Sequence, residues 1–298
     1  MTESATLQYS SLPTAGRNLR YVRWLRPFQI DVRALAVMRI MLGITVLYDV
    51  MSRIGLLRWF YTDDGASPRS VFLGGSLKWQ SFYSLSGTYG WAVLLLTIHG
   101  ILALLFTIGF RTRLVTIALF AMMWSLINRN PTLSHGGNHL VAWMLIWSLF
   151  VPVNAVASVD AYTARPRPRF RRVASIATAA MLIQIAFVYW LAFAAKTSAD
   201  WRSDFSAVYY FLNSHLSTPL GYAIGQLPAL SQLLTIGSLG LELFGPFFAL
   251  LTYSMPRTRT LIVLGFILFH LGLVATMYVG TFSFICIAAW MIYIPTPM

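Results

Sequence analysis

Residues 173–195 read VASIATAAMLIQIAFVYWLAFAA and contain no charged side chain. A helix of about 20 mostly apolar residues is long enough to cross the hydrocarbon core of a bilayer. The apolar run is continuous, whereas strands of membrane barrels alternate polar and apolar positions, so we expect a helix here. Comparable runs occur at about 34–52, 89–109, 113–128, 138–155, 231–252, 259–278 and 280–295. The pattern predicts an all-α, polytopic transmembrane helical bundle of about eight helices.

The composition of the whole chain agrees with lipid as its solvent. Of 298 residues, 57% are hydrophobic and only 10% are charged, against about 25% charged in soluble domains. The net charge is +13, but the basic residues stand in short runs between apolar segments rather than on one face with stacking aromatics. That distribution indicates membrane topology and excludes nucleic acid as a partner. The single cysteine, Cys286, rules out an intramolecular disulfide.

The distribution of Lys and Arg predicts the orientation. With a cytoplasmic N-terminus, the inner segments hold 14 of these residues and the outer segments 7, while Arg39 lies inside the first helix. Cytoplasmic loops carry the excess of basic residues, so we expect both termini in the cytoplasm of a multi-pass protein of the cell inner (plasma) membrane. Residues 1–30 lack an apolar core, so we expect no cleavable signal peptide. The Arg-rich, Lys-poor usage is typical of a GC-rich bacterial genome.

Two domains are expected. Residues 1–30 form a cytoplasmic basic segment, in which Asn18–Arg26 mixes Arg with Tyr and Trp and is expected to bind lipid headgroups at the membrane interface. Residues 31–298 form the transmembrane domain. Two of its outer connections, 53–88 and 203–216, are too aromatic or too amphipathic for simple loops. We expect them to form short interfacial helices on the outer face, with membrane lipids as partners.

Polar residues gather on the predicted outer side of the bundle. Polar groups in membrane segments are costly, so each indicates a structural or functional role. Asp49 and Arg53 are spaced i, i+4, which allows a simple ion pair as well as a role in shaping a site. The outer ends and loops hold Asp49, Asp63, Asp64, Asn128, Asn130, His135, Asn138, His139, Lys196, Asp200 and Asp204. The candidate chemistry is therefore expected on the non-cytoplasmic face.

Lys196 is the most distinctive of these residues. The chain has twenty Arg and only two Lys, so it prefers guanidinium for ordinary basic roles. A lysine amine can lose its proton when desolvated and then act as a base, which arginine cannot do. The alternative is a lysine whose ammonium reaches the lipid headgroups.

The two histidines before the fourth helix are four residues apart, in His135-Gly-Gly-Asn-His139. This spacing would place them on one helix face, but we expect Gly136 and Gly137 to break the helix between them, and no metal site is predicted. His139 is a candidate for hydrogen bonding or proton transfer, with helix entry as the structural alternative.

Four ionisable residues, Arg39, His99, Glu242 and His270, lie within apolar segments. An unpaired charge in a membrane is very costly, so an Arg39–Glu242 pair is the natural structural expectation. Alternatively, Arg39, Glu242 and His270 line a cavity that binds a polar headgroup. Pro246 should kink its helix and free backbone groups.

Several of these blocks together resemble the HTTM (horizontally transferred transmembrane) domain family. The likeness covers about residues 28–295, and its motifs are fairly specific in combination. They are Asp31-x-x-x-Leu35-Ala-Val-x-Arg39-x-x-x-Gly43, Asp49 with Arg53-x-Gly55, Asn138-His139, Pro152, Ser158-Val-Asp160, Lys196-Thr-Ser-Ala-Asp-Trp201, and Leu241-Glu242 to Pro246.

The resemblance extends to the membrane core of the vitamin K-dependent γ-glutamyl carboxylase, a member of that family. It implies that Lys196 is the base that deprotonates a reduced quinone, that His139 assists as a second catalytic residue, and that the cofactor is a vitamin K-like quinone with no metal. Asp49, Arg53 and Trp201 are expected to shape the site. The carboxylase has a large lumenal region after its core, whereas this sequence stops at Met298, so the likeness implies the fold more strongly than γ-carboxylation.

Two functions of different class follow. The first is an enzyme that acts on a quinone or another lipid-soluble substrate, either carboxylase-like and carbon–carbon bond forming, or a quinone-dependent oxidoreductase. The second is a non-catalytic membrane module that binds a lipid or assists the maturation of a secreted peptide or protein. A transporter, suggested by Arg39, Glu242 and His270, is a more distant third.

Overall fold

The computed structural model describes residues 24–73, 81–164 and 171–295. Each of the eight predicted helices is present, which confirms the all-α bundle. They are α2 (Val32–Ser52), α5 (Tyr89–Ile108), α6 (Thr112–Arg129), α7 (Gly136–Ser148), α9 (Ile176–Ala195), α13 (Pro228–Leu251), α14 (Pro256–Thr276) and α15 (Phe282–Trp290). The fourth helix ends before the predicted residue 155, because the chain turns ahead of Pro152.

Short elements connect these helices. The short α-helices are α3 (Leu57–Phe60), α4 (Arg69–Leu73), α8 (Val159–Thr163), α10 (Ala199–Arg202), α11 (Ala207–Leu212) and α12 (Pro219–Gly225). The 3₁₀ turns are η1 (Arg26–Phe28), η2 (Ile54–Leu56), η3 (Phe82–Ser84), η4 (Pro131–Leu133), η5 (Thr252–Ser254) and η6 (Met291–Tyr293). Among the described residues the only sheet is an antiparallel pair, β1 (Ile30–Asp31) with β2 (Arg172–Val173), in which Ile30 faces Val173.

Five apolar helical segments are long enough to cross a membrane. They are Val32–Phe60, Tyr89–Ile108, Ile176–Ala195, Pro228–Ser254 and Pro256–Thr276. The other predicted crossings, α6, α7 and α15, are shorter or more polar, so the total of eight crossings stays a prediction. Large apolar side chains such as Phe244, Phe247 and Leu251 of α13 are exposed, as expected of helices that face lipid.

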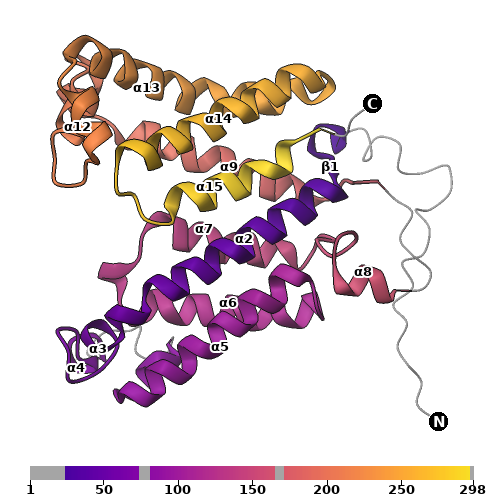
Figure 1. Cartoon of the computed structure of the whole chain (residues 1–298). Coiled ribbons are helices and arrows are strands. Elements are labelled where there is room, and N and C mark those ends of the chain that lie inside the picture. The colour runs from indigo at the N-terminus through magenta and orange to yellow at the C-terminus, as the bar shows by residue number, and fades with distance from the viewer. Residues whose placement is uncertain (1–23, 74–80, 165–170, 296–298) are drawn as a thin grey trace, which may run out of the picture.

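Helix α2 lies at the centre of the bundle, between α5 on one side and α15 on the other, as Figure 1 shows. Leu35, Met38 and Leu42 of α2 are fully buried. A side chain at Gly43 would overlap Thr107 of α5, so glycine permits the close approach of these two helices. Helices α9, α13 and α14 form the other half of the bundle.

The bundle has two distinct ends. The short helices α3, α4 and α12 lie at one end, on the left of Figure 1, and β1 lies at the other. Short helices are present in both of the connections for which they were predicted: α3 and α4 in 53–88, and α11 in 203–216. Leu212 of α11 is buried, and the Val208 amide donates to Thr235 of α13. Residues 18–23, 74–80 and 165–170 lie outside the described part of the chain. Most of the basic N-terminal segment, Lys78 and most of the Arg165–Arg172 loop fall there.

Candidate functional site

Lys196 terminates α9 at the end of the bundle where α10 and α11 follow it. Its backbone leaves the helical region at φ −83° and ψ 78°, and its side chain is 19% exposed. The ammonium donates to both carboxylate oxygens of Glu242 on α13, a residue that is only 5% exposed. The Trp201 ring lies 4.7 Å from Nζ and adds a cation–π contact. Three of the predicted site residues are therefore in contact.

Arg202 holds the backbone of Lys196 in place. Its Nε donates to the Lys196 carbonyl at 2.6 Å and its Nη2 to the Phe193 carbonyl at 2.8 Å. The guanidinium also lies 4.0 Å from the Phe193 ring. The Phe193 carbonyl also accepts the Lys196 backbone N–H at 3.2 Å, and the negative end of the α9 dipole favours a cation at this position. Arg202 is a positioning residue that the sequence analysis missed, although a basic residue shortly after the end of α9 was a usable signal.

Glu242 is fixed by its position on α13. Pro246 has no N–H, so the Glu242 carbonyl lacks its usual helical donor, yet the helix continues to Leu251. The Trp190 indole of α9 donates to the Leu243 carbonyl at 3.1 Å, which ties the two helices together beside the ion pair. Pro246 therefore removes one backbone hydrogen bond of α13 without ending the helix.

The expected Arg39–Glu242 pair is wrong. Arg39 is fully buried and donates instead to the carbonyls of Phe106 and Ala157, at the β1 end of α2. Glu242 contacts Lys196, because α13 packs on α9 and α14. The order of segments along the chain does not reveal which helices are neighbours, so the partner of each charge could not be read from the sequence.

A second polar cluster surrounds Asp49 and Arg53, which form the predicted i, i+4 ion pair at 2.9 Å. Both are buried. Arg53 Nη1 also donates to the Tyr61 hydroxyl at 2.6 Å, and Thr281 of the turn before α15 donates to Asp49 at 3.3 Å. The pairing prediction is confirmed, and its buried setting makes it a structural anchor of α2.

His135, rather than His139, points into this cluster. Its Nε2 lies 3.0 Å from the Thr281 hydroxyl, and its Nδ1 accepts from the Gly137 amide. The neutral ring therefore carries its proton on Nε2, which gives a directed chain of hydrogen bonds from His135 through Thr281 to Asp49. Burial lowers the pKa of His135 and favours that neutral form. His139 is exposed.

The expectation that the glycine pair breaks the helix is also wrong. Helix α7 begins at Gly136, and His135 caps it together with the side chain of Asn138. The spacing of His135 and Asn138 is that of a capping box and was the signal for this arrangement. Because His135 stands outside the helix, it and His139 do not share a helix face.

His270 has hydrogen-bond partners within the core. Its Nε2 is hydrogen-bonded to the Tyr189 hydroxyl at 2.6 Å, and that hydroxyl accepts from the Trp290 indole at 2.7 Å. Its Nδ1 lies 3.4 Å from the Ser283 hydroxyl. The structure therefore places His270 in a buried network that links α9, α14 and α15, and Arg39 at the opposite end from Lys196. The described residues contain no group of three or more His, Cys, Asp or Glu that could hold a metal.

Comparison with known proteins gives one match. The family model of the HTTM domain matches residues 27–297, nearly the whole chain. No curated protein matches, and no solved structure does.

Proposed function

The chain belongs to the HTTM domain family of membrane proteins, and we propose that it is an enzyme whose Lys196 deprotonates a reduced quinone or another acidic, lipid-soluble compound. The observation that supports this most is the contact of Lys196 with Glu242 and Trp201 at the end of α9. A partly buried amine with a carboxylate partner is suited to proton transfer, because both carboxylate oxygens lie within hydrogen-bonding distance of the amine.

The proposed step is a proton transfer. In the reactive form the shared proton rests on Glu242 and Lys196 is a neutral amine. The amine takes a proton from a hydroquinone hydroxyl, which leaves an ammonium ion and a hydroquinone monoanion. The Trp201 ring face then stabilises the new cation. The proposed proton transfer uses Lys196, Glu242 and Trp201, and it assigns no role to the exposed His139.

The second candidate is a non-catalytic membrane module that binds a lipid or assists the maturation of a secreted peptide or protein. It is favoured by the complete charge pairing of Lys196 and Glu242, which is compatible with a purely structural role. In that case only the positive charge at position 196 matters.

Lys196→Arg separates the two candidates, because arginine keeps the charge and the pair but cannot act as a base near neutral pH. Purified protein in lipid nanodiscs would be given an anaerobically reduced naphthoquinone, and its consumption followed after oxygen is admitted. For the enzyme we expect at least a hundredfold loss in both Lys196→Arg and Lys196→Ala, with exposed Arg257→Ala unchanged. Full turnover by folded Lys196→Ala protein would refute the enzyme. Absence of turnover in the unaltered protein, together with unchanged lipid binding by Lys196→Arg, would favour the module.

Mass spectrometry of molecules that co-purify from native membranes provides a second test. The enzyme predicts a quinone in stoichiometric amount, and the module predicts phospholipid alone.

We also propose that both termini lie on the cytoplasmic side of a bacterial plasma membrane. This orientation places Lys196 on the outer side. The two-to-one excess of Lys and Arg on the inner segments supports this. Reporter fusions at the C-terminus and within the 203–216 connection should report opposite sides of the membrane.

A further inference from the structure

A polar cavity of about 330 Å³ opens at the β1 end of the bundle, away from Lys196. Its volume falls at the lower end of the ~300–1,000 Å³ range of ligand sites. Segments far apart in the sequence meet there: η1, β1, β2, and the turn between α13 and α14. The polar lining side chains are Arg26, Gln29, Asp31, Arg172, Ser254 and Arg259.

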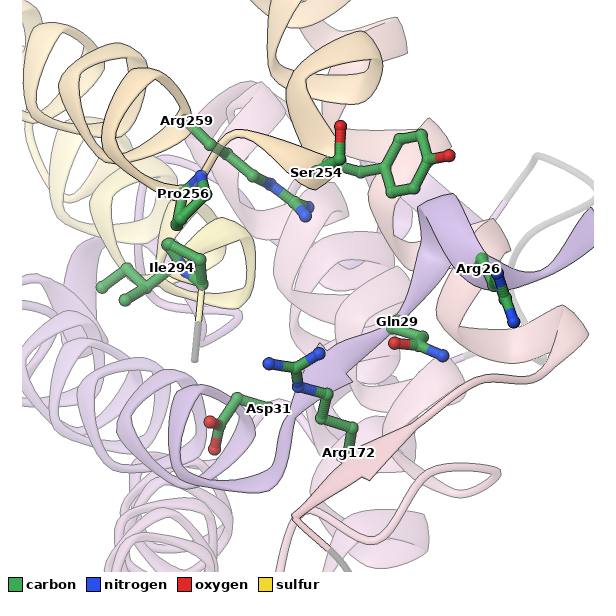
Figure 2. Close-up of a pocket in the computed structure, with 10 residues that line it drawn as sticks. Arg26, Gln29, Asp31, Arg172, Ser254, Pro256, Arg259 and Ile294 are labelled. Carbon is green, nitrogen blue, oxygen red and sulfur yellow. The ribbon is translucent and has the colours of Figure 1, made fainter. Parts of the chain in front are cut away.

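Arg259 is the most informative residue of this cavity. It lies in the first turn of α14, is 4% exposed, and its Nε and Nη2 have no hydrogen-bond partner among the described residues. The contact that the structure gives its guanidinium is with the Tyr293 ring, whose centre is 5.0 Å away. Figure 2 shows the guanidinium extending into the cavity. A buried cation without a hydrogen-bonding anion is costly, so its setting indicates a missing negative partner.

The other charges of the cavity add to the same field. The Arg172 side chain extends into the space from the opposite wall, and Arg26 lies at the side (Figure 2). Asp31 is the carboxylate among the lining residues, and Arg33 already binds it through Nε at 3.1 Å and Nη2 at 2.7 Å. Three arginines, Arg26, Arg172 and Arg259, therefore line one cavity beside a single lining carboxylate.

We propose that this cavity binds a phosphate group, and that its source is the headgroup of an anionic phospholipid. Guanidinium groups match phosphate oxygens in paired hydrogen bonds, and three of them from separate segments suit a tetrahedral anion better than a planar carboxylate. A lipid source is favoured by the surface beside the cavity, where Leu251, Tyr253 and Met255 at the α13–α14 turn are exposed. Acyl chains can lie along that apolar surface while the headgroup is in the cavity.

The test measures binding to the full chain in a phosphate-free maltoside detergent. Phosphatidylglycerol added to the micelles is one probe, and inorganic phosphate is the other. We expect phosphatidylglycerol to raise the melting temperature of the unaltered protein. Arg259→Met should weaken its binding about tenfold or more, the usual effect of losing a charged hydrogen-bonding partner. Arg257→Met is the matched control, because Arg257 lies in the same turn but is exposed, and it should change binding less than threefold.

The two probes distinguish the source of the phosphate. If inorganic phosphate alone binds, with the same dependence on Arg259, the phosphate site is supported and its ligand is a free anion. If neither probe binds, or if Arg259→Met and Arg257→Met bind equally, the proposal is overturned. Should Arg259→Met fail to fold, Arg172→Gln on the opposite wall is used, with the same expectation. None of these outcomes depends on quinone turnover at Lys196, so this proposal and the proposed enzyme stand or fall separately.

Discussion

At one end of the bundle, two buried acids are each matched by a cation: Asp49 binds Arg53 and Glu242 binds Lys196. At the other end, Arg259 is as deeply buried but has no hydrogen-bond partner for Nε and Nη2. We call the first the paired end and the second the cavity end. Burying a charge is costly at both ends. At the paired end, protein side chains supply the opposite charge, whereas at the cavity end we propose that a bound ligand supplies it.

This difference shows two ways in which a membrane protein can use a buried charge. A paired charge is held in one geometry by its partner, and the Lys196–Glu242 pair is the one to which we assign proton transfer. An unpaired guanidinium beside a cavity holds no proton that it can release near neutral pH, and so it serves binding. The contrast predicts that removing charge has opposite effects on stability at the two ends.

The largest effect is expected from Asp49→Ala at the paired end. It leaves Arg53 buried without its carboxylate, which should lower the free energy of unfolding by about 3–5 kcal/mol. Asp64→Ala, at an exposed acid in the same region, should change it by less than about 0.5 kcal/mol. Denaturant unfolding in detergent, followed by tryptophan fluorescence, measures both. Equal effects of the two substitutions would show that the buried pair contributes nothing.

Lys196→Met should lower the free energy of unfolding by about 2–3 kcal/mol, because it strands the Glu242 carboxylate. The effect is smaller than at Asp49, since the Lys196 side chain is 19% exposed. The double variant with Glu242→Leu should recover most of the loss, because neither charge is then left alone. Additive losses in the same unfolding assay would contradict the pairing.

At the cavity end, removing a charge should increase the free energy of unfolding rather than lower it. In detergent free of anionic lipid and phosphate, Arg259→Met should raise the free energy of unfolding by about 1–2 kcal/mol, because it removes a buried charge that lacks a partner. Arg257→Met should stay within about 0.5 kcal/mol of the unaltered protein. A destabilised Arg259→Met would mean that the guanidinium already has a partner within the protein.

The smallest effect concerns Asp160 of α8, a carboxylate at the cavity end that does have partners. It accepts from the backbone amides of Arg111 and Thr112 at the start of α6, and from Asn154. Burial alone would raise its pKa, but these hydrogen bonds outweigh burial and hold the pKa below the usual 3.8. Its stabilisation is therefore present above about pH 4 and is lost as the pH falls further. Asp160→Asn should remove about 1 kcal/mol at pH 7 and flatten the acid side of a plot of unfolding free energy against pH.

Much of the fold could be predicted from the sequence. The long apolar runs located all eight helices to within a few residues, except for the end of α7, because lipid requires that backbone groups bond within each segment. The i, i+4 spacing was enough to predict the ion pair of Asp49 and Arg53, because residues four apart are neighbours on successive turns of a helix. The rarity of lysine in an arginine-rich chain was enough to single out Lys196 as a candidate site residue.

The tertiary structure decided the contacts between segments. Glu242 pairs with Lys196 and not with Arg39, because α13 packs against α9. His135 and not His139 faces Asp49, because the start of α7 lies beside Thr281. The cavity around Arg259 needs η1, β1, β2 and α14 together, and no one of these segments indicates it alone. Hydrophobicity along the chain determines which segments enter the membrane, whereas the side-by-side order of helices depends on packing between residues far apart in sequence, and that order determines which charges have partners.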